Sequence, residues 1–144
     1  MPQHEVRFHE QVQAPVDQVF EFLSQHRNFA ALFGGSCTVV KAGNDAAEPN
    51  GVGSVRRIGP GPLSFDEQIV VFERPHRIDY TIVRGGPLKN HLGTIVLKST
   101  GSGTEIDYTI RFDGKLPGVG ALAARALAFG WKLGARKALA KLER

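Results

Sequence analysis

The sequence predicts an α+β domain in which an antiparallel sheet packs against a long C-terminal helix. From residue 36 onward, short β-type segments recur between turn sequences, without the intervening helices of a parallel βαβ arrangement. The last third of the chain changes to apolar residues at helical spacing. The 144 residues fit one domain, 1–144, and no linker or internal repeat divides them.

The N-terminal part predicts a strand followed by two short helices. Polar and apolar residues alternate along residues 4–13, as a half-buried strand requires. Pro15 then suits the first position of a helix, and Asp17 suits the positive end of its dipole. Helical spacing predicts a helix over 16–25, and a second short helix over 28–33.

Six further strands are predicted in the middle of the chain. They cover residues 36–43, 52–59, 63–73, 77–85, 89–99 and 104–113. Glycine and proline turns separate them, for example Asn50-Gly51 and Gly101-Ser102-Gly103. Together with the first strand they make seven predicted strands, in the pattern of an antiparallel meander.

Residues 119–142 predict one long helix with an apolar face toward the sheet. The residues assigned to that face are Val119, Leu122, Ala126, Phe129, Gly130 and Leu133. Arg125, Lys132 and Arg136 are expected on the opposite side. Because Lys137, Lys141 and Arg144 turn onto the apolar face, the final turns are expected to leave the core.

Composition excludes several classes of protein. Hydrophobic residues make up 42% and charged residues 22% of the chain, which is ordinary for a soluble globular domain. Neither a signal-peptide core nor an apolar run of the ~20 residues needed to span a bilayer occurs, so we expect no integral membrane association. A single cysteine, Cys37, excludes an intrachain disulfide and favours the reducing cytoplasm.

The charges and motifs predict no nucleic-acid partner, no metal and no cofactor. The net charge is +4, and we interpret the 18 Lys and Arg residues, apart from a mild C-terminal concentration, as scattered charges that serve solubility. The five histidines lack metal-ligand spacing. Residues 118–123 match GxGxxA, but no βαβ unit surrounds them, so we read these glycines as a helix start.

The order of elements resembles the START-like or Bet v 1-like (SRPBCC) helix-grip superfamily, in particular its bacterial polyketide cyclase/dehydrase-type branch. The stretches that carry the resemblance are 14–20 (APVDQVF), 51–56 (GVGSVR), 72–78 (FERPHRI), 103–108 (GTEIDY) and Pro117-Gly118. The resemblance implies a sheet curved around the C-terminal helix, with a cavity between them for a hydrophobic molecule. Members bind sterols, lipids, plant hormones or quinones, and a minority catalyse cyclisation or dehydration of polyketides, so the fold alone does not name the activity.

Strand alternation nominates residues that face this cavity. The predicted ligand-binding residues are Arg56, Glu67, Ile69, Tyr80, His91, Ile95, Tyr108 and Ile110 from the sheet, and Leu122, Ala126 and Phe129 from the helix. His91, beside two inward tyrosines, is a candidate acid, base or carbonyl ligand, or else a satisfied histidine at a strand end. Glu67 and Arg56 form either a polar anchor inside the cavity or a cross-strand pair on the solvated convex face.

Three functions remain open at this point. In the first, the cavity of a monomer or homodimer binds or transports a small hydrophobic molecule. In the second, the protein is an enzyme of the cyclase or dehydratase type that uses His91 or Glu67 as acid or base. In the third, it is a protein-interaction module like START-like cochaperones, or contacts a membrane or nucleic acid through Arg125, Lys132 and Arg136.

Overall fold

A seven-stranded antiparallel sheet forms the body of the protein in the computed structural model, which describes residues 2–143. The strands lie in the order β1-β7-β6-β5-β4-β3-β2, so the first strand pairs with the last. Their bounds are β1 (His4–Val12), β2 (Cys37–Lys41), β3 (Val55–Ile58), β4 (Phe65–Glu73), β5 (Arg77–Gly85), β6 (Leu88–Thr100) and β7 (Gly103–Gly114). The predicted helix-grip architecture is therefore confirmed.

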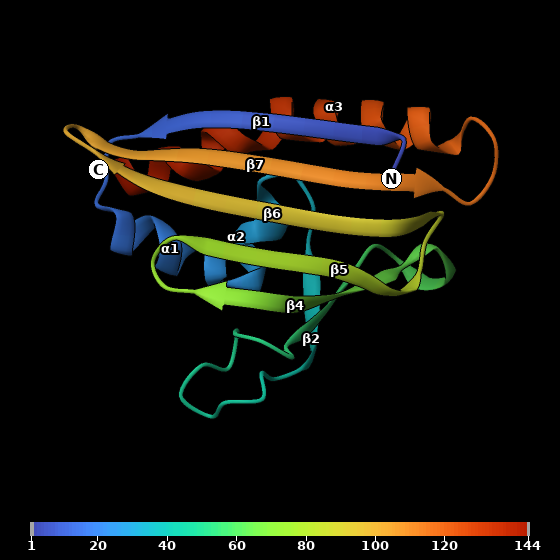
Figure 1. Cartoon of the computed structure of the whole chain (residues 1–144), viewed down its shortest axis with the longest axis horizontal. Helices are drawn as coiled ribbons and strands as arrows, with labels where there is room; N and C mark the ends of the chain where they lie inside the picture. Colours follow the sequence, from blue (N-terminus) through green and yellow to red (C-terminus); the bar gives the residue numbers. More distant parts are fainter. Residues whose placement is uncertain (1, 144) are drawn as a thin grey trace.

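Helices cover one face of the sheet. They are α1 (Val16–Ser24), α2 (His26–Ala31) and α3 (Val119–Leu139), with short 3-10 turns η1 (Gly61–Leu63) and η2 (Ala140–Glu143). Figure 1 shows α3 running along the sheet behind β1 and β7, while α1 and α2 lie behind the middle strands. None of the helices within residues 2–143 is both long and apolar enough to cross a bilayer.

Every predicted element is present, and most boundaries move by one or two residues. The largest difference is the strand predicted over 52–59, which begins only at Val55. The preceding residues form a turn, because Gly53 has φ of 92° and the N–H of Ser54 donates to the carbonyl of Gly51 at 3.0 Å. A left-handed φ ends regular strand pairing, which local β propensity alone does not reveal.

The predicted inner face of α3 is wrong. Leu122, Phe129 and Leu133 are each more than 60% exposed, whereas the buried residues of the helix are Gly120, Trp131, Gly134, Ala135, Ala138 and Leu139. The helix is apolar on both sides. Its small residues, Trp131 and Leu139 face the core, whereas Leu122, Phe129 and Leu133 face solvent.

The final turns of α3 are packed into the core, which corrects the expectation that they leave it. Leu139 is fully buried, and the Trp131 ring stacks on Phe8 at 4.3 Å between ring centroids. A Cβ at Gly134 would lie 2.6 Å from the backbone oxygen of Ala31. Glycine is therefore required where α3 crosses the chain that follows α2.

Candidate functional site

A cavity of about 400 Å³ opens between the sheet, the end of α2 and the N-terminal half of α3. Its walls are largely apolar, and small side chains at Ala30, Gly35, Ala123 and Ala126 leave the space that larger residues would fill. The lining comprises Phe29, Ala30, Phe33, Gly35, Ile58, Phe65, Glu67, Tyr80, Ile82, Pro87, Leu88, His91, Ile110, Ala123, Ala126 and Leu127. Its volume falls in the usual range of ligand sites, about 300–1,000 Å³.

A buried ion pair lies at the wall formed by β3 and β4. The two strands pair so that Arg56 stands opposite Glu67, and Arg56 Nε donates to Glu67 Oε1 at 2.9 Å. Arg56 is 2% exposed and Glu67 is 5% exposed. Of the two interpretations of this pair, the one on the solvated convex face is therefore wrong.

Aromatic rings hold the guanidinium of Arg56 in place behind Glu67. Its central carbon lies 3.7 Å from the centroid of the Phe29 ring and 4.8 Å from that of Tyr80. Such contacts favour a cation that has lost its water shell. Arg56 Nη2 is buried and has no hydrogen-bond partner among residues 2–143, so the cluster keeps one unsatisfied donor.

Glu67 is the carboxylate that reaches the cavity. Burial raises the pKa of Glu67, and the nearby Arg56 opposes this rise only in part. Oε1 accepts from Arg56, whereas no hydrogen bond to Oε2 is found within the described chain. One carboxylate oxygen therefore stays free to accept a hydrogen bond from a ligand.

A directional chain of hydrogen bonds leads from Arg56 away from the cavity. Arg56 Nη1 donates to His26 Nδ1 at 3.3 Å, so the other ring nitrogen carries the proton and donates to Ser54 Oγ at 2.8 Å. Ser54 then donates to the carbonyl of Lys41. Burial, aided by Arg56, lowers the pKa of His26 to about 4, which keeps the ring neutral at pH 7. This series of hydrogen bonds could not be predicted from the sequence, because its members lie on α2, a turn and β2.

His91 lies in the cavity wall as a neutral hydrogen-bond donor. The backbone N–H of Ile82 donates to His91 Nδ1 at 3.2 Å, so the neutral ring must carry its proton on Nε2. Burial, aided by the charge of Arg56, lowers the pKa of His91 to about 4. At pH 7 His91 can therefore donate from Nε2 to a ligand oxygen, but it has no free nitrogen to accept a proton.

The two inward tyrosines bind each other. The hydroxyls of Tyr80 and Tyr108 share a hydrogen bond, and burial raises the pKa of both well above the usual value. Tyr80 lies in the cavity wall, whereas Tyr108 lies in the core behind it. Both hydroxyls are therefore neutral and already hydrogen-bonded to each other. The pair has a structural role, with Tyr80 in the cavity wall and Tyr108 supporting it from the core.

The predicted ligand-binding residues divide into three groups. Glu67, Tyr80, His91, Ile110 and Ala126 line the cavity. Arg56, Ile69, Ile95 and Tyr108 are buried but lie outside the lining. Leu122 and Phe129 point to solvent, so their predicted place in the cavity is wrong.

Residues from the end of α2 were missed. Phe29, Ala30 and Phe33 contribute one side of the cavity. Their apolar side chains were visible in the predicted helix over 28–33, and that was the available signal. Nothing in their periodicity indicates that they face α3 and the sheet at the same time.

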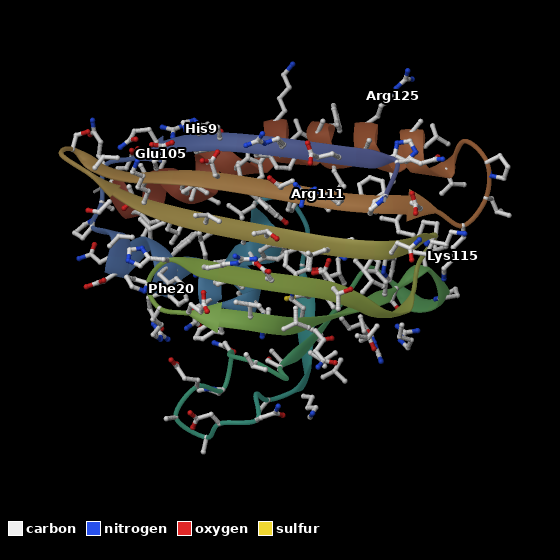
Figure 2. All side chains as sticks on the ribbon, in the orientation of Figure 1. His9, Phe20, Glu105, Arg111, Lys115 and Arg125 are labelled. Atoms are coloured by element: carbon white, nitrogen blue, oxygen red, sulfur yellow. The ribbon has the colours of Figure 1, made fainter. Side chains whose placement is uncertain are left out.

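A second group of polar residues lies on the outer surface of the sheet. His9, Glu105 and Asp107 come from β1 and β7, and their ligand-type atoms lie within 4.8 Å of one another (Figure 2). His9 Nε2 and Glu105 Oε1 are hydrogen-bonded at 2.9 Å, and this bond raises the pKa of His9. An exposed ion pair accounts for this contact, and the absence of a metal stays a prediction.

Comparison with known proteins gives one family and many similar folds. The sequence profile described as "Polyketide cyclase / dehydrase and lipid transport" matches residues 3–144. No curated protein matches the chain in sequence.

Several solved structures share the fold across nearly the whole chain. Protein CV1439 from Chromobacterium violaceum is 18% identical with a TM-score of 0.71, and the match covers 97% of each chain. A solution structure from Thermobifida fusca is 20% identical with a TM-score of 0.69, and covers 94% of this chain and 90% of that one. Ara h 8.0201 is 18% identical with a TM-score of 0.65, and covers 94% of each chain. At these identities the likeness shows the fold alone.

Proposed function

The chain belongs to the polyketide cyclase/dehydrase and lipid transport family, and on that premise we propose that it binds a small hydrophobic ligand in the cavity between the sheet and α3, for transport or sequestration. The observation that carries the proposal is the cavity of about 400 Å³, whose apolar wall is interrupted by few polar groups. Burial of an apolar ligand in such a site contributes about 25 cal/mol for each Å² removed from water.

The polar groups of the wall define the end of the ligand that would lie between them. His91 offers a donor at Nε2, and Glu67 offers an acceptor at Oε2. A ligand oxygen such as a carbonyl suits His91, and a hydroxyl suits Glu67. We therefore expect a lipophile that carries a carbonyl and a hydroxyl at one end, because unpaired polar groups in a dry site cost affinity.

One observation favours an enzyme of the cyclase or dehydratase type as the second candidate. Glu67 is a buried carboxylate with a raised pKa in the cavity wall, which suits a general base. His91 is the weaker candidate for that role, because its free nitrogen already carries the proton. In this reading Glu67 would take a proton next to a ligand carbonyl, and His91 would donate to the carbonyl oxygen.

The binding proposal is tested with a variant that fills the cavity from α3. Ala126 lines the cavity and is exposed on its outer side, so Ala126→Trp is expected to obstruct the space without disturbing the core. Ala128→Trp is the matched control, because Ala128 is exposed on the same helix and does not line the cavity. Gly93 is unsuitable as the site of a cavity-filling tryptophan, because a Cβ there would collide with the ring of Tyr80.

The measurement is organic extraction of the purified proteins followed by mass spectrometry, together with titration of an apolar fluorescent dye. A lipophile recovered from the parent and from Ala128→Trp, but lost from Ala126→Trp, would support the proposal. A parent that yields no lipophile and does not bind the dye would refute it. If a ligand is recovered, Glu67→Gln separates the two candidates: conversion of that ligand by the parent but not by the variant favours the enzyme.

A further inference from the structure

The basic residues of the chain are divided unevenly between two parts of the molecule. Residues 115–142 contain 6 of the 18 Lys and Arg residues and none of the 14 Asp and Glu residues. The rest of the chain carries 12 cations and all 14 acids, so the +4 net charge comes from this one segment. The C-terminal concentration of basic residues noted in the sequence therefore accounts for the whole of the net charge.

The outward side of α3 combines these cations with exposed apolar side chains. Leu122, Phe129 and Leu133 are 66%, 62% and 63% exposed, and with Ala126 they fall on one stripe at helical spacing. We call this stripe and its flanking cations Arg125, Lys132, Arg136 and Lys137 the outer face of α3. Exposed apolar patches of this kind commonly mark a contact surface.

The cations lie along the two edges of the apolar stripe and not on the opposite side of the helix. At 100° per residue, Arg125 and Lys132 fall on one side of the stripe and Lys137 on the other. Arg136 is the partly neutralised member, because it lies 3.7 Å from Glu10 and 3.4 Å from Glu143. Arg125, Lys132 and Lys137 have no acidic group within 4.0 Å anywhere in residues 2–143, and Arg125 projects from α3 away from the sheet (Figure 2).

This face also borders the cavity. Ala126 belongs both to the exposed stripe and to the cavity lining, and Ala123 and Leu127 of the same helix line the cavity beside it. At the sheet wall of the cavity, the η1 turn connects Ile58 and Phe65, which line it, and carries Leu63 at 76% exposure. Exposed apolar side chains therefore occur next to both the helix wall and the sheet wall of the cavity.

We propose that the outer face of α3 docks on an anionic lipid surface, with Leu122, Phe129 and Leu133 inserted at the headgroup boundary and Arg125, Lys132 and Lys137 paired with lipid phosphates. An apolar stripe with basic edges is the pattern of a helix that lies in the plane of a membrane interface. Docking in this orientation places the cavity opening against the lipid, so an apolar ligand would pass between them with little exposure to water.

The charges distinguish a lipid surface from the other possible occupants. A second copy of the chain packed through this face would bring two sets of cations together without any acid from 115–142 to compensate them. A nucleic acid would satisfy the cations but would leave the leucine and phenylalanine side chains without an apolar partner. Only an anionic bilayer offers both a phosphate layer and an adjacent hydrocarbon layer.

The proposal is tested by sedimentation of the full chain with vesicles of phosphatidylglycerol and phosphatidylcholine in equal parts, and with vesicles of phosphatidylcholine alone. We expect binding to the anionic vesicles that weakens at high salt. Arg125→Glu with Lys132→Glu should weaken this binding on the order of a hundredfold, because each cation near such a surface contributes about 1 kcal/mol and reversal adds repulsion. Leu122→Ser with Leu133→Ser should weaken it as well, by about tenfold or more.

Matched controls come from the sheet. Arg7→Glu with Lys41→Glu changes the charge equally at exposed strand positions, and Val83→Ser with Val96→Ser removes exposed apolar side chains there. Both control variants should bind like the parent, and circular dichroism should show that all variants are folded. Since the docking test needs no ligand in the cavity, it can fail independently of the proposed ligand binding.

Three outcomes would overturn the proposal. The first is no binding of the parent to anionic vesicles at low salt. The second is binding that the control variants lose as strongly as the α3 variants. The third is tight binding of duplex DNA that depends on Arg125 and Lys132 but not on Leu122 and Leu133, together with weak vesicle binding.

Discussion

The two halves of α3 make opposite use of the same kinds of residue. Toward its C-terminus, Trp131, Gly134 and Leu139 pack tightly on β1 and the end of α2. Toward its N-terminus, Ala123 and Ala126 face a cavity that contains the carboxylate of Glu67. We call these the packed end and the cavity end.

The comparison shows where the molecule gains stability and where it gives stability up. The packed end gains from apolar contact, which does not depend on pH. The side chains of Arg56, Glu67, His26 and His91 are buried in and around the cavity that the cavity end faces. Removing such groups from water costs free energy. Tight packing at one end therefore holds the helix while the other end stays open and polar enough for a ligand.

The largest effect is expected from the buried ion pair of the cavity end. Arg56→Met should lower the free energy of unfolding by about 3–5 kcal/mol, because Glu67 is left buried without its cation. Adding Glu67→Leu should recover most of this loss, since the unpaired charge is then gone. Urea unfolding of both variants at pH 7 tests this. A double variant as unstable as the single one would show that Arg56 acts through packing on Phe29 and not through the pair.

The packed end is tested by the same substitution at a buried and an exposed position of α3. Leu139→Ala should cost about 2–5 kcal/mol, because it removes a fully buried side chain and leaves a cavity. Leu133→Ala should change the free energy of unfolding by less than about 0.5 kcal/mol, since Leu133 is exposed. Thermal and urea unfolding provide the comparison. Equal losses in the two variants would contradict the orientation of α3 described above.

The pH dependence of stability should come from the cavity end. The pKa of His26 and of His91 falls from 6.5 to about 4 on folding. The unfolded chain therefore binds these protons first as pH falls, so the folded state loses stability between about pH 6.5 and 4 and keeps it above pH 6.5. The loss is at most about 3 kcal/mol for each histidine.

Urea unfolding at a series of pH values measures this loss. His91→Gln should reduce the loss of unfolding free energy between pH 6.5 and 4 by the contribution of one histidine. His9→Gln, which removes a histidine whose pKa is raised on folding, is the control and should not reduce this loss. Because the raised pKa of Glu67 acts in the opposite direction in parent and variant alike, an unchanged slope in His91→Gln would argue against a neutral buried His91.

The smallest effect is expected at the hydrogen bond of Trp131 in the packed end. Its indole N–H donates to Glu10 Oε2 at 3.1 Å in a partly buried site. Trp131→Phe keeps a ring against Phe8 but removes the donor, and should cost about 0.5–1.5 kcal/mol beyond the loss of ring area. A double-mutant cycle with Glu10→Ala isolates this term. A coupling energy near zero would show that stacking alone holds Trp131.

Much of the fold could be predicted from the sequence, and less of the site. Alternation and turn residues placed all seven strands and both early helices, because these signals act over a few residues. Alternation also put His91 on an inward position of its strand, but it left Glu67 open between the cavity and the convex face. The hydrogen bonds from Arg56 through His26 and Ser54 to the Lys41 carbonyl could not be predicted, because they join α2, β2 and the start of β3, which meet only in the folded protein.

The order and type of the elements, and with them the helix-grip family, follow from periodicity and turn chemistry, because these signals are local. The rotation of α3 depends instead on contacts between distant parts of the chain. Both sides of that helix are apolar, so hydrophobicity could not choose between them. Side-chain size determines which side of α3 faces the core. Glycine and alanine allow the close approach at Ala31 that Leu122, Phe129 and Leu133 would prevent.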